Sequence, residues 1–117
     1  MSHPNRVLYN VTCSVNPDIH QEWLEWMLKE HIPDVLRTGM FDEFKVCRIH
    51  EYEENGITYA VQYIAPSKEG LDRYMQEFAP ALQQKHHVKY GNQVSAFRTT
   101  LEILHESNIS FPDLSAN

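Results

Sequence analysis

The stretch WLEWMLKEHIPDVLRTG, residues 23–39, contains both tryptophans and the longest helical pattern of the chain. At 100° per residue, its apolar side chains and one histidine share a broad face, and charged residues gather opposite. The members of that face are Leu24, Met27, Leu28, His31 and Val35. We therefore expect a helix that packs on an apolar surface and that kinks or restarts at Pro33, which lacks a backbone donor.

One flank of this helix is also apolar. Ile19, Trp23 and Trp26 widen the apolar arc, with Glu30 set among them. The arc is broader than the roughly 100° stripe that a single supporting sheet requires. The flank therefore calls for a second cover from another helix, a partner subunit or a ligand.

Segments with the alternation of β-strands flank this helix and a second one. Residues 6–15, 57–65 and 94–104 alternate with a period of two, as strands with one buried face do. In the last of them we expect Phe97, Thr99, Leu101 and Ile103 to face the core. Residues 41–51 form another predicted strand, but their alternation does not show which set is buried.

Local signals mark where the elements begin and end. Asn16-Pro17-Asp18 is typical of a helix start near Pro17, and Gly39 of a helix end. Asn55-Gly56 favours a tight type I′ turn. Ser67 predicts the cap of a second amphipathic helix. The apolar stripe of that helix consists of Leu71, Tyr74, Met75, Phe78 and Leu82.

The element order predicts an α+β fold, the ferredoxin-like βαββαβ sandwich. Its four-stranded antiparallel sheet, in the order 4-1-3-2, would carry both helices on one face. We expect residues 1–106 to form one domain and 107–117 a C-terminal extension. The helix-free face would present mixed polar and apolar side chains and join two chains in a homodimer, a dimeric α/β barrel. Its expected members are Leu8, Asn10, Thr12, Thr58, Gln62, Arg98, Thr100 and Glu102, with Ala60, Ile64 and Ala96 among them and Arg48 and His50 as further candidates.

Composition narrows the classes of partner. The 117 residues are 42% hydrophobic and 22% charged, with a net charge of −6 and scattered basic residues, which argues against nucleic acid as a partner. No apolar run approaches the roughly 20 residues that span a bilayer, so we expect a cytoplasmic protein without membrane contact. Cys13 and Cys47 are expected to remain free thiols, because the predicted strand order separates them by a strand.

Several short motifs resemble known proteins. The layout is similar to the dimeric α/β-barrel superfamily of ferredoxin-like proteins. More closely, a set of motifs resembles a family of short bacterial proteins catalogued as a domain of unknown function. That resemblance covers residues 6 to about 104 and implies the fold and a homodimer, but no activity. The motifs are Tyr9-Asn10-Val11-Thr12, Trp23 to Met27, His31-Ile32-Pro33, Thr38-Gly39-Met40-Phe41 and Phe97-Arg98-Thr99.

The resemblance also suggests catalytic candidates. Quinol-type monooxygenases and haem-degrading enzymes of the superfamily use an asparagine, a tryptophan and a histidine in a pocket between sheet and helices. Asn10 resembles the early first-strand asparagine of that pattern. Trp23, Trp26 and His31 lie on the first helix, whereas the corresponding groups of those relatives come from later elements. His31 and Asn10 are thus the candidates for catalysis.

Two other interpretations of these residues stay open. His31 could be a core histidine bonded to a neighbour such as Tyr59 or to a backbone carbonyl. Alternatively, it could line a cleft for a small apolar or aromatic molecule and act there as a general base. The expected lining of that cleft is Tyr9, Asn10, Trp23, Trp26, Glu30, His31, Tyr63 and Tyr74.

The sequence predicts neither a metal site nor a cofactor. His50, Glu51, Glu53 and Glu54 are typical of a solvated charged turn, and no phosphate loop, nucleophile elbow or Cys-x-x-Cys motif occurs. Two functions remain. One is a homodimer that binds a small molecule or serves as an interaction module. The other is a cofactor-free monooxygenase or isomerase, so whether the protein is an enzyme is left open.

Overall fold

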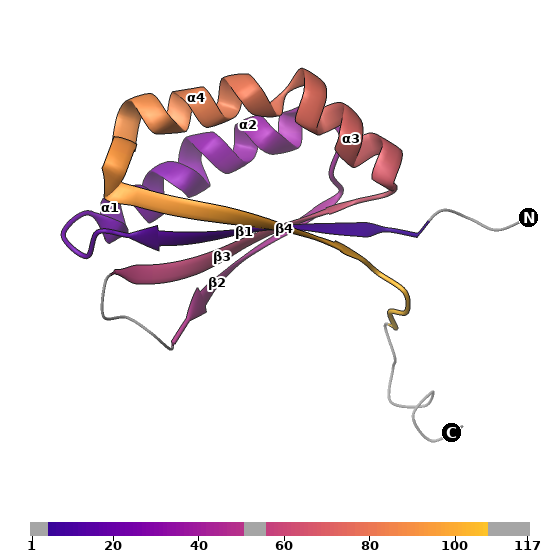
Figure 1. Ribbon diagram of the computed structural model, residues 1–117, viewed down its shortest axis with the longest axis horizontal. Helices are drawn as coiled ribbons and strands as arrows, with labels where there is room; N and C mark the ends of the chain where they lie inside the picture. Colours follow the sequence, from indigo (N-terminus) through magenta and orange to yellow (C-terminus); the bar gives the residue numbers. More distant parts are fainter. Residues whose placement is uncertain (1–4, 51–55, 108–117) are drawn as a thin grey trace, which may run out of the picture.

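The computed structural model describes residues 5–50 and 56–107. Four strands form one antiparallel sheet in the order β2-β3-β1-β4, and the helices cover one of its faces (Figure 1). The predicted ferredoxin-like α+β fold and its strand order are confirmed. In chain order, the strands are β1 (Val7–Val15), β2 (Glu43–Ile49), β3 (Ile57–Ala65) and β4 (Val94–Glu102).

The first helical segment begins with α1 (His20–Trp26), three residues later than the expected start near Pro17. A turn takes the place of the first helical turn. The side-chain Oδ1 of Asn16 accepts from the backbone N–H of Asp18 at 3.0 Å, and the Asn16 carbonyl accepts from the N–H of Ile19 at 3.0 Å. The asparagine therefore caps a local turn, which such side chains also favour.

A π-helical turn, η1 (Met27–His31), joins α1 to α2 (Ile32–Arg37). The N–H of Ile32 bonds the carbonyl of Met27, five residues back, so the wide turn acts as one inserted residue. It shifts the helical phase just before Pro33 and buries Ile32, which is 1% exposed, while Leu28 is 47% exposed. The expectation that Leu28 belongs to the buried face is therefore wrong, because it assumed one unbroken 3.6-residue period.

The second helical segment comprises α3 (Lys68–Glu77), α4 (Ala79–Tyr90) and the short η2 (Gly91–Gln93). Ser67 caps α3 as predicted, its Oγ accepting from the N–H of Gly70 at 3.2 Å. The helix breaks at Phe78, just before Pro80. Gly91 has a φ of 53°, which lets the chain leave α4 and enter the last strand.

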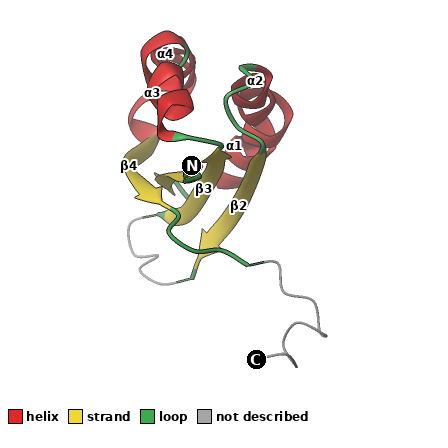
Figure 2. Ribbon diagram, turned by 90° about the vertical axis from the view of Figure 1, so that its right-hand side faces the viewer, coloured by secondary structure: helices red, strands yellow, loops and turns green. Residues whose placement is uncertain are grey.

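The core lies between the sheet and the helical layer. In Figure 2, α3 and α4 lie above β4, and α1 and α2 lie above β2. An aromatic cluster occupies one end of the core, where the ring of Phe41 is 4.8 Å from that of Tyr74 and 5.2 Å from that of Tyr63. Trp23, at 0% exposure, fills the other end against Tyr59. The apolar flank of the first helix is covered by α4, whose His86 and Tyr90 contact Trp23 and Trp26.

Strand β4 has the opposite phase to the one expected. Arg98 pairs with Val11 and Thr100 with Tyr9 in the β1 register, so these alternate β4 residues face the helices. Phe97 and Leu101 instead lie on the uncovered face, with exposures of 64% and 46%. Alternation alone could not reveal this, because an edge strand can direct its apolar side chains away from its own core.

Three more expected members of the helix-free face also lie on the helix side. Ala96 and Glu102 belong with Arg98 and Thr100 on the helix side. The phase of β2 is now fixed as well. Val46 pairs with Val61 and Arg48 with Tyr59, so both face the helices.

The remaining expectations concern cysteines, turns and termini. Cys13 is buried, Cys47 is exposed and both are free, as predicted.

Gly56, expected in a tight turn, does not have a positive φ. A glycine is needed there for close packing, because a Cβ would lie 2.7 Å from Ser14 Oγ. Residues 51–55 and 108–117 lie outside the described residues, so the Asn55 turn and most of the C-terminal extension stay predictions. Across 5–50 and 56–107, no helix is both long and apolar enough to cross a membrane.

Candidate functional site

A cavity of about 60 Å³ lies between the sheet and the helices. Its lining residues come from β1, η1, β3, α3, α4 and β4, so both halves of the chain form its walls. The apolar lining residues are Val11, Cys13, Met27, Val61 and Ala96. The polar lining residues are Tyr9, His31, Tyr63, Tyr74, Gln83, His86 and Arg98.

Three tyrosines line the cavity near the aromatic cluster. The ring of Tyr9 lies 6.2 Å from that of Tyr63 and 6.0 Å from that of Tyr74. Burial raises the pKa of all three phenols, so they stay protonated at neutral pH. The Tyr63 hydroxyl is buried and has no hydrogen-bond partner among the described residues. It is therefore an available polar contact for a molecule in the cavity.

His31 contributes a second buried polar atom without a partner. Its Nδ1 makes no hydrogen bond within the described part of the chain. Burial, followed by the neighbouring His86, lowers the pKa of His31 to about 4. The imidazole is thus neutral at pH 7, and Nδ1 is free to accept or donate one hydrogen bond, depending on the tautomer.

His86 has its tautomer set by a neighbour. The indole Nε1–H of Trp23 donates to His86 Nε2 at 2.9 Å, so Nε2 is the acceptor and Nδ1 carries the proton. Burial lowers the pKa of His86 too, and the Arg98 guanidinium adds to the effect. The rings of His31 and His86 are 5.8 Å apart. Two neutral imidazoles therefore lie side by side on the helical wall.

Arg98 supplies the positive charge of the site. Its Nε donates to the Tyr9 hydroxyl at 3.1 Å. It has no ion pair with a carboxylate among residues 5–50 and 56–107, and no Asp or Glu lines the cavity. The guanidinium of Arg98 thus has donors left for an acceptor that enters from outside.

The cavity lacks the groups of a thiol or metal centre. Burial raises the pKa of the Cys13 thiol to about 12, so it is not a nucleophile at neutral pH. Within the described residues, no three His, Cys, Asp or Glu side chains are grouped to hold a metal ion. Its chemistry is therefore that of hydrogen bonding, aromatic contact and one cation.

Four of the expected site residues line the cavity: Tyr9, His31, Tyr63 and Tyr74. The other four do not. Trp23 is buried behind His86, and Trp26 donates from Nε1 to the Glu30 carboxylate at 2.8 Å on the outer side of the helix.

Asn10 lies on the opposite face of the sheet. Its Nδ2 donates to Thr12 Oγ1 at 2.9 Å, and its Oδ1 accepts from Gln62 at 3.3 Å. The pairing of Asn10 with His31 in one pocket is therefore wrong. The expected bond between His31 and Tyr59 is also absent. Tyr59 bonds His20 instead, at 2.8 Å.

Sequence reasoning missed His86, Gln83 and Arg98. The two α4 residues follow the stripe of the second helix past Pro80, at a spacing of three that one helical face would share. Arg98 was placed on the wrong side of the sheet. The signal for its true side was the tyrosine on β1, because a buried phenol needs a hydrogen-bond partner.

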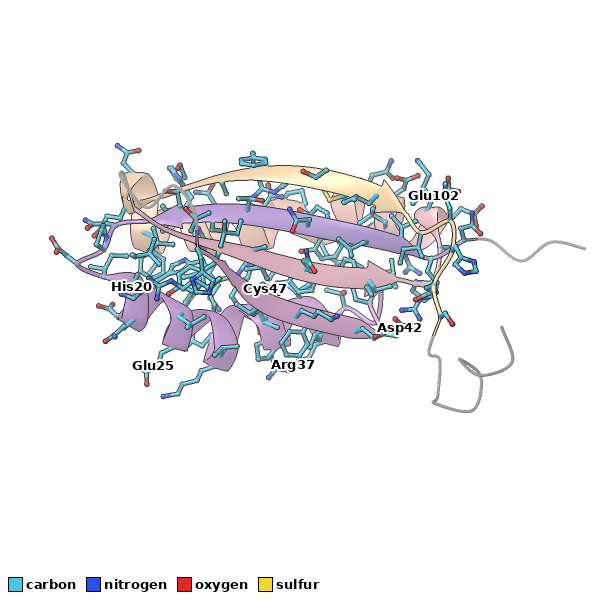
Figure 3. The ribbon with its side chains drawn as sticks, turned by 90° about the horizontal axis from the view of Figure 1, so that it is seen from below. His20, Glu25, Arg37, Asp42, Cys47 and Glu102 are labelled. Carbon is cyan, nitrogen blue, oxygen red and sulfur yellow. The ribbon has the colours of Figure 1, made fainter. Side chains whose placement is uncertain are left out.

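Figure 3 shows the sheet from its uncovered face, where the strand register aligns the side chains in rows across the strands. One apolar row joins Leu101, Leu8 and Ile64. A second row joins Phe97, Thr12, Ala60 and Cys47, and a polar row of Thr99, Asn10, Gln62 and Lys45 runs between them. The face thus carries apolar side chains on either side of a hydrogen-bonded centre.

The family described as Domain of unknown function (DUF4286) matches residues 6–104. This chain belongs to that family. None of the curated proteins compared with the DUF4286 chain matches it.

Solved structures share the fold of the DUF4286 chain. A variant of SnoaB, a cofactor-independent oxygenase from Streptomyces nogalater, is 10% identical with a TM-score of 0.60 and covers 92% of this chain and 98% of its own. A dimeric ferredoxin-like protein from an uncultured marine organism is 7% identical with a TM-score of 0.59, covering 88% and 99%.

A hypothetical Arabidopsis thaliana protein is 14% identical to the DUF4286 chain, with a TM-score of 0.64 and coverage of 92% and 96%. At these identities the comparisons show the ferredoxin-like fold alone.

Proposed function

We propose that this DUF4286 chain is a homodimer that binds a small apolar or aromatic molecule in the cavity between its sheet and helices. The observation that carries the proposal is that His31 and Tyr63 line one cavity, and that His31 Nδ1 and the Tyr63 hydroxyl are buried without a partner among residues 5–50 and 56–107. Buried polar atoms are normally hydrogen-bonded, and a bound molecule would supply both partners.

The proposed dimer joins the uncovered sheet faces of two chains. The exposed Phe97 and Leu101 flank the polar row at Asn10, and burying them would remove apolar area from water. The polar row would fix how the two faces align. The dimeric ferredoxin-like protein of similar fold adds support.

The proposed location is the cytoplasm. Both cysteines are free thiols, which agrees with a reducing compartment.

Native mass spectrometry of freshly purified protein tests both parts. We expect twice the 13.7 kDa chain mass together with a retained small molecule. Ala96→Leu, on the cavity wall, should abolish retention of the molecule, whereas the control Ala81→Leu on the exposed side of α4 should not. A single-chain mass would contradict the dimer, and equal retention by both variants would contradict the cavity as the site.

One observation favours a second function, a cofactor-free isomerase or monooxygenase. His31 is neutral, and its unpartnered Nδ1 faces no competing bond within the described residues. In the isomerase, this nitrogen would take a proton from one substrate carbon and return it to another, without net oxidation. The monooxygenase would also need dioxygen as oxidant. Exchange of a deuterium label from the retained molecule into water, lost in His31→Gln, would distinguish catalysis from binding.

A further inference from the structure

The cavity adjoins a second hollow that leads out of the protein. A groove of about 360 Å³ lies between α4 and β4 and includes Pro80, Gln84, His87 and Gly91. Four residues line both the cavity and this α4–β4 groove: Gln83, His86, Ala96 and Arg98. These four form the boundary between the two spaces. A molecule in the cavity would therefore reach water past them.

This boundary is positively charged within an acidic protein. The chain has a net charge of −6, yet neither the cavity nor the α4–β4 groove is lined by an Asp or a Glu. Arg98 carries the charge, and its hydrogen bond to the Tyr9 hydroxyl is to a neutral acceptor. The side chains of Gln83 and His86 add neutral donors beside it. Such a set of donors favours an anionic group.

The size and inner wall of the cavity restrict what enters. A volume of about 60 Å³ is less than half of the roughly 150 Å³ of an engineered cavity that binds benzene, so at most one six-membered ring can enter, with part of it extending toward the α4–β4 groove. The rings of Tyr9, Tyr63 and Tyr74 offer aromatic contact to such a ring. The Tyr63 hydroxyl and His31 Nδ1 can bond a polar atom on it.

We infer that the ligand is a monocyclic aromatic acid, whose ring enters the cavity and whose carboxylate meets Arg98 at the boundary with the α4–β4 groove. This inference rests on the proposed function and specifies its ligand. A hydroxyl on the ring would meet the buried polar atoms of Tyr63 and His31. Fused ring systems would exceed the space available.

Isothermal titration calorimetry with matched probes tests the charge. The probes are 4-hydroxybenzoate, which is anionic, and 4-hydroxybenzyl alcohol, which is neutral and of similar shape. We expect 4-hydroxybenzoate to bind at least about tenfold more tightly, as a charge-assisted hydrogen bond allows. Arg98→Gln should remove that preference, whereas Arg73→Gln should keep it. Arg73 is the control because it removes the same charge from the exposed surface of α3, where it pairs with Glu77.

Circular dichroism and melting curves establish that each variant is folded, which is expected because Arg98 is exposed. Equal affinity of the two probes, or a preference that survives Arg98→Gln, would overturn the inference and leave the proposed binding function standing. Binding of neither probe would overturn the inference as well. The proposed function would fail with it only if native mass spectrometry also found no retained molecule.

Discussion

Trp23 and His86 are joined by a hydrogen bond of 2.9 Å that crosses from the first helical segment to the second. The indole donor belongs to a fully buried side chain, and the imidazole acceptor lines the cavity. This contact links the two helical segments above the sheet and fixes the tautomer of one cavity residue. Its loss should therefore affect both stability and the site.

His86→Phe keeps a ring of similar size but leaves the Trp23 N–H buried without an acceptor. We expect the free energy of unfolding to fall by about 1–3 kcal/mol in a denaturant titration. The control is His87→Phe, which makes the same exchange at the exposed neighbouring position and should change stability by no more than about 0.5 kcal/mol. Equal effects of the two variants would show that the hydrogen bond is unimportant.

The low pKa of His31 predicts how stability changes with pH. Burial and His86 lower this pKa to about 4, with Lys85 and Arg98 adding to them and Asp34 opposing them. Between pH 6.5 and about 4, the unfolded chain binds a proton that the folded chain does not. The free energy of unfolding should therefore fall as the pH drops through this window, with a limit of roughly 3 kcal/mol from this group.

His31→Gln removes this contribution and should flatten the dependence of stability on pH between 6.5 and 4. His86, whose pKa is also lowered, would provide the part that remains. Denaturant titrations at several pH values measure the slope, and proton NMR of the His31 ring measures its titration directly. An unchanged slope in His31→Gln, or a ring that titrates near pH 6.5, would contradict this account.

Tyr63→Phe and Tyr9→Phe form a matched pair on neighbouring strands. The Tyr63 hydroxyl has no partner among the described residues, so its removal should leave stability unchanged or raise it by up to about 1 kcal/mol. The Tyr9 hydroxyl accepts from Arg98, so its removal should cost about 1 kcal/mol. Thermal unfolding compares them, and a larger loss in Tyr63→Phe would show that its hydroxyl is already bonded.

Phe97→Asp tests the proposed dimer. A carboxylate in place of an exposed ring on the uncovered face would be costly to bury between two chains. Light scattering at micromolar concentration should then give the mass of one chain, while the unaltered protein gives two. Val88→Asp is the control, because Val88 is 75% exposed on α4, away from that face. Dissociation by both variants, or by neither, would argue against this interface.

The fold could be predicted from the sequence because its signals are local and agree with one another. Alternation in β1 and β3 and the Ser67 cap each correspond to an observed feature. The site was harder to predict because it depends on which way a strand faces. Alternation defines two sets of residues on β4 but does not say which set meets the helices, so Arg98 was placed on the wrong face.

The prediction of which residues of the first helix are buried failed for a related reason. A periodic pattern assumes a constant number of residues per turn, and the wide turn at Met27–His31 breaks that assumption. His86 was missed because it and His87 are adjacent, so they point to different sides of a helix, and the sequence does not show which of them faces the core. Only the partner indole on another helix distinguishes His86 from His87.

The wide turn also makes the spacing between Trp23 and Ile32 one residue longer than a regular helix would need. Because this turn holds the extra residue, removing one residue from 27–31 would restore a regular helix while Trp23 and Ile32 both kept facing the sheet. Elsewhere in α1 or α2, the same removal would rotate everything on one side of the deletion by about 100° relative to the other. A one-residue gap should thus be tolerated in this turn and not in the regular turns on either side of it.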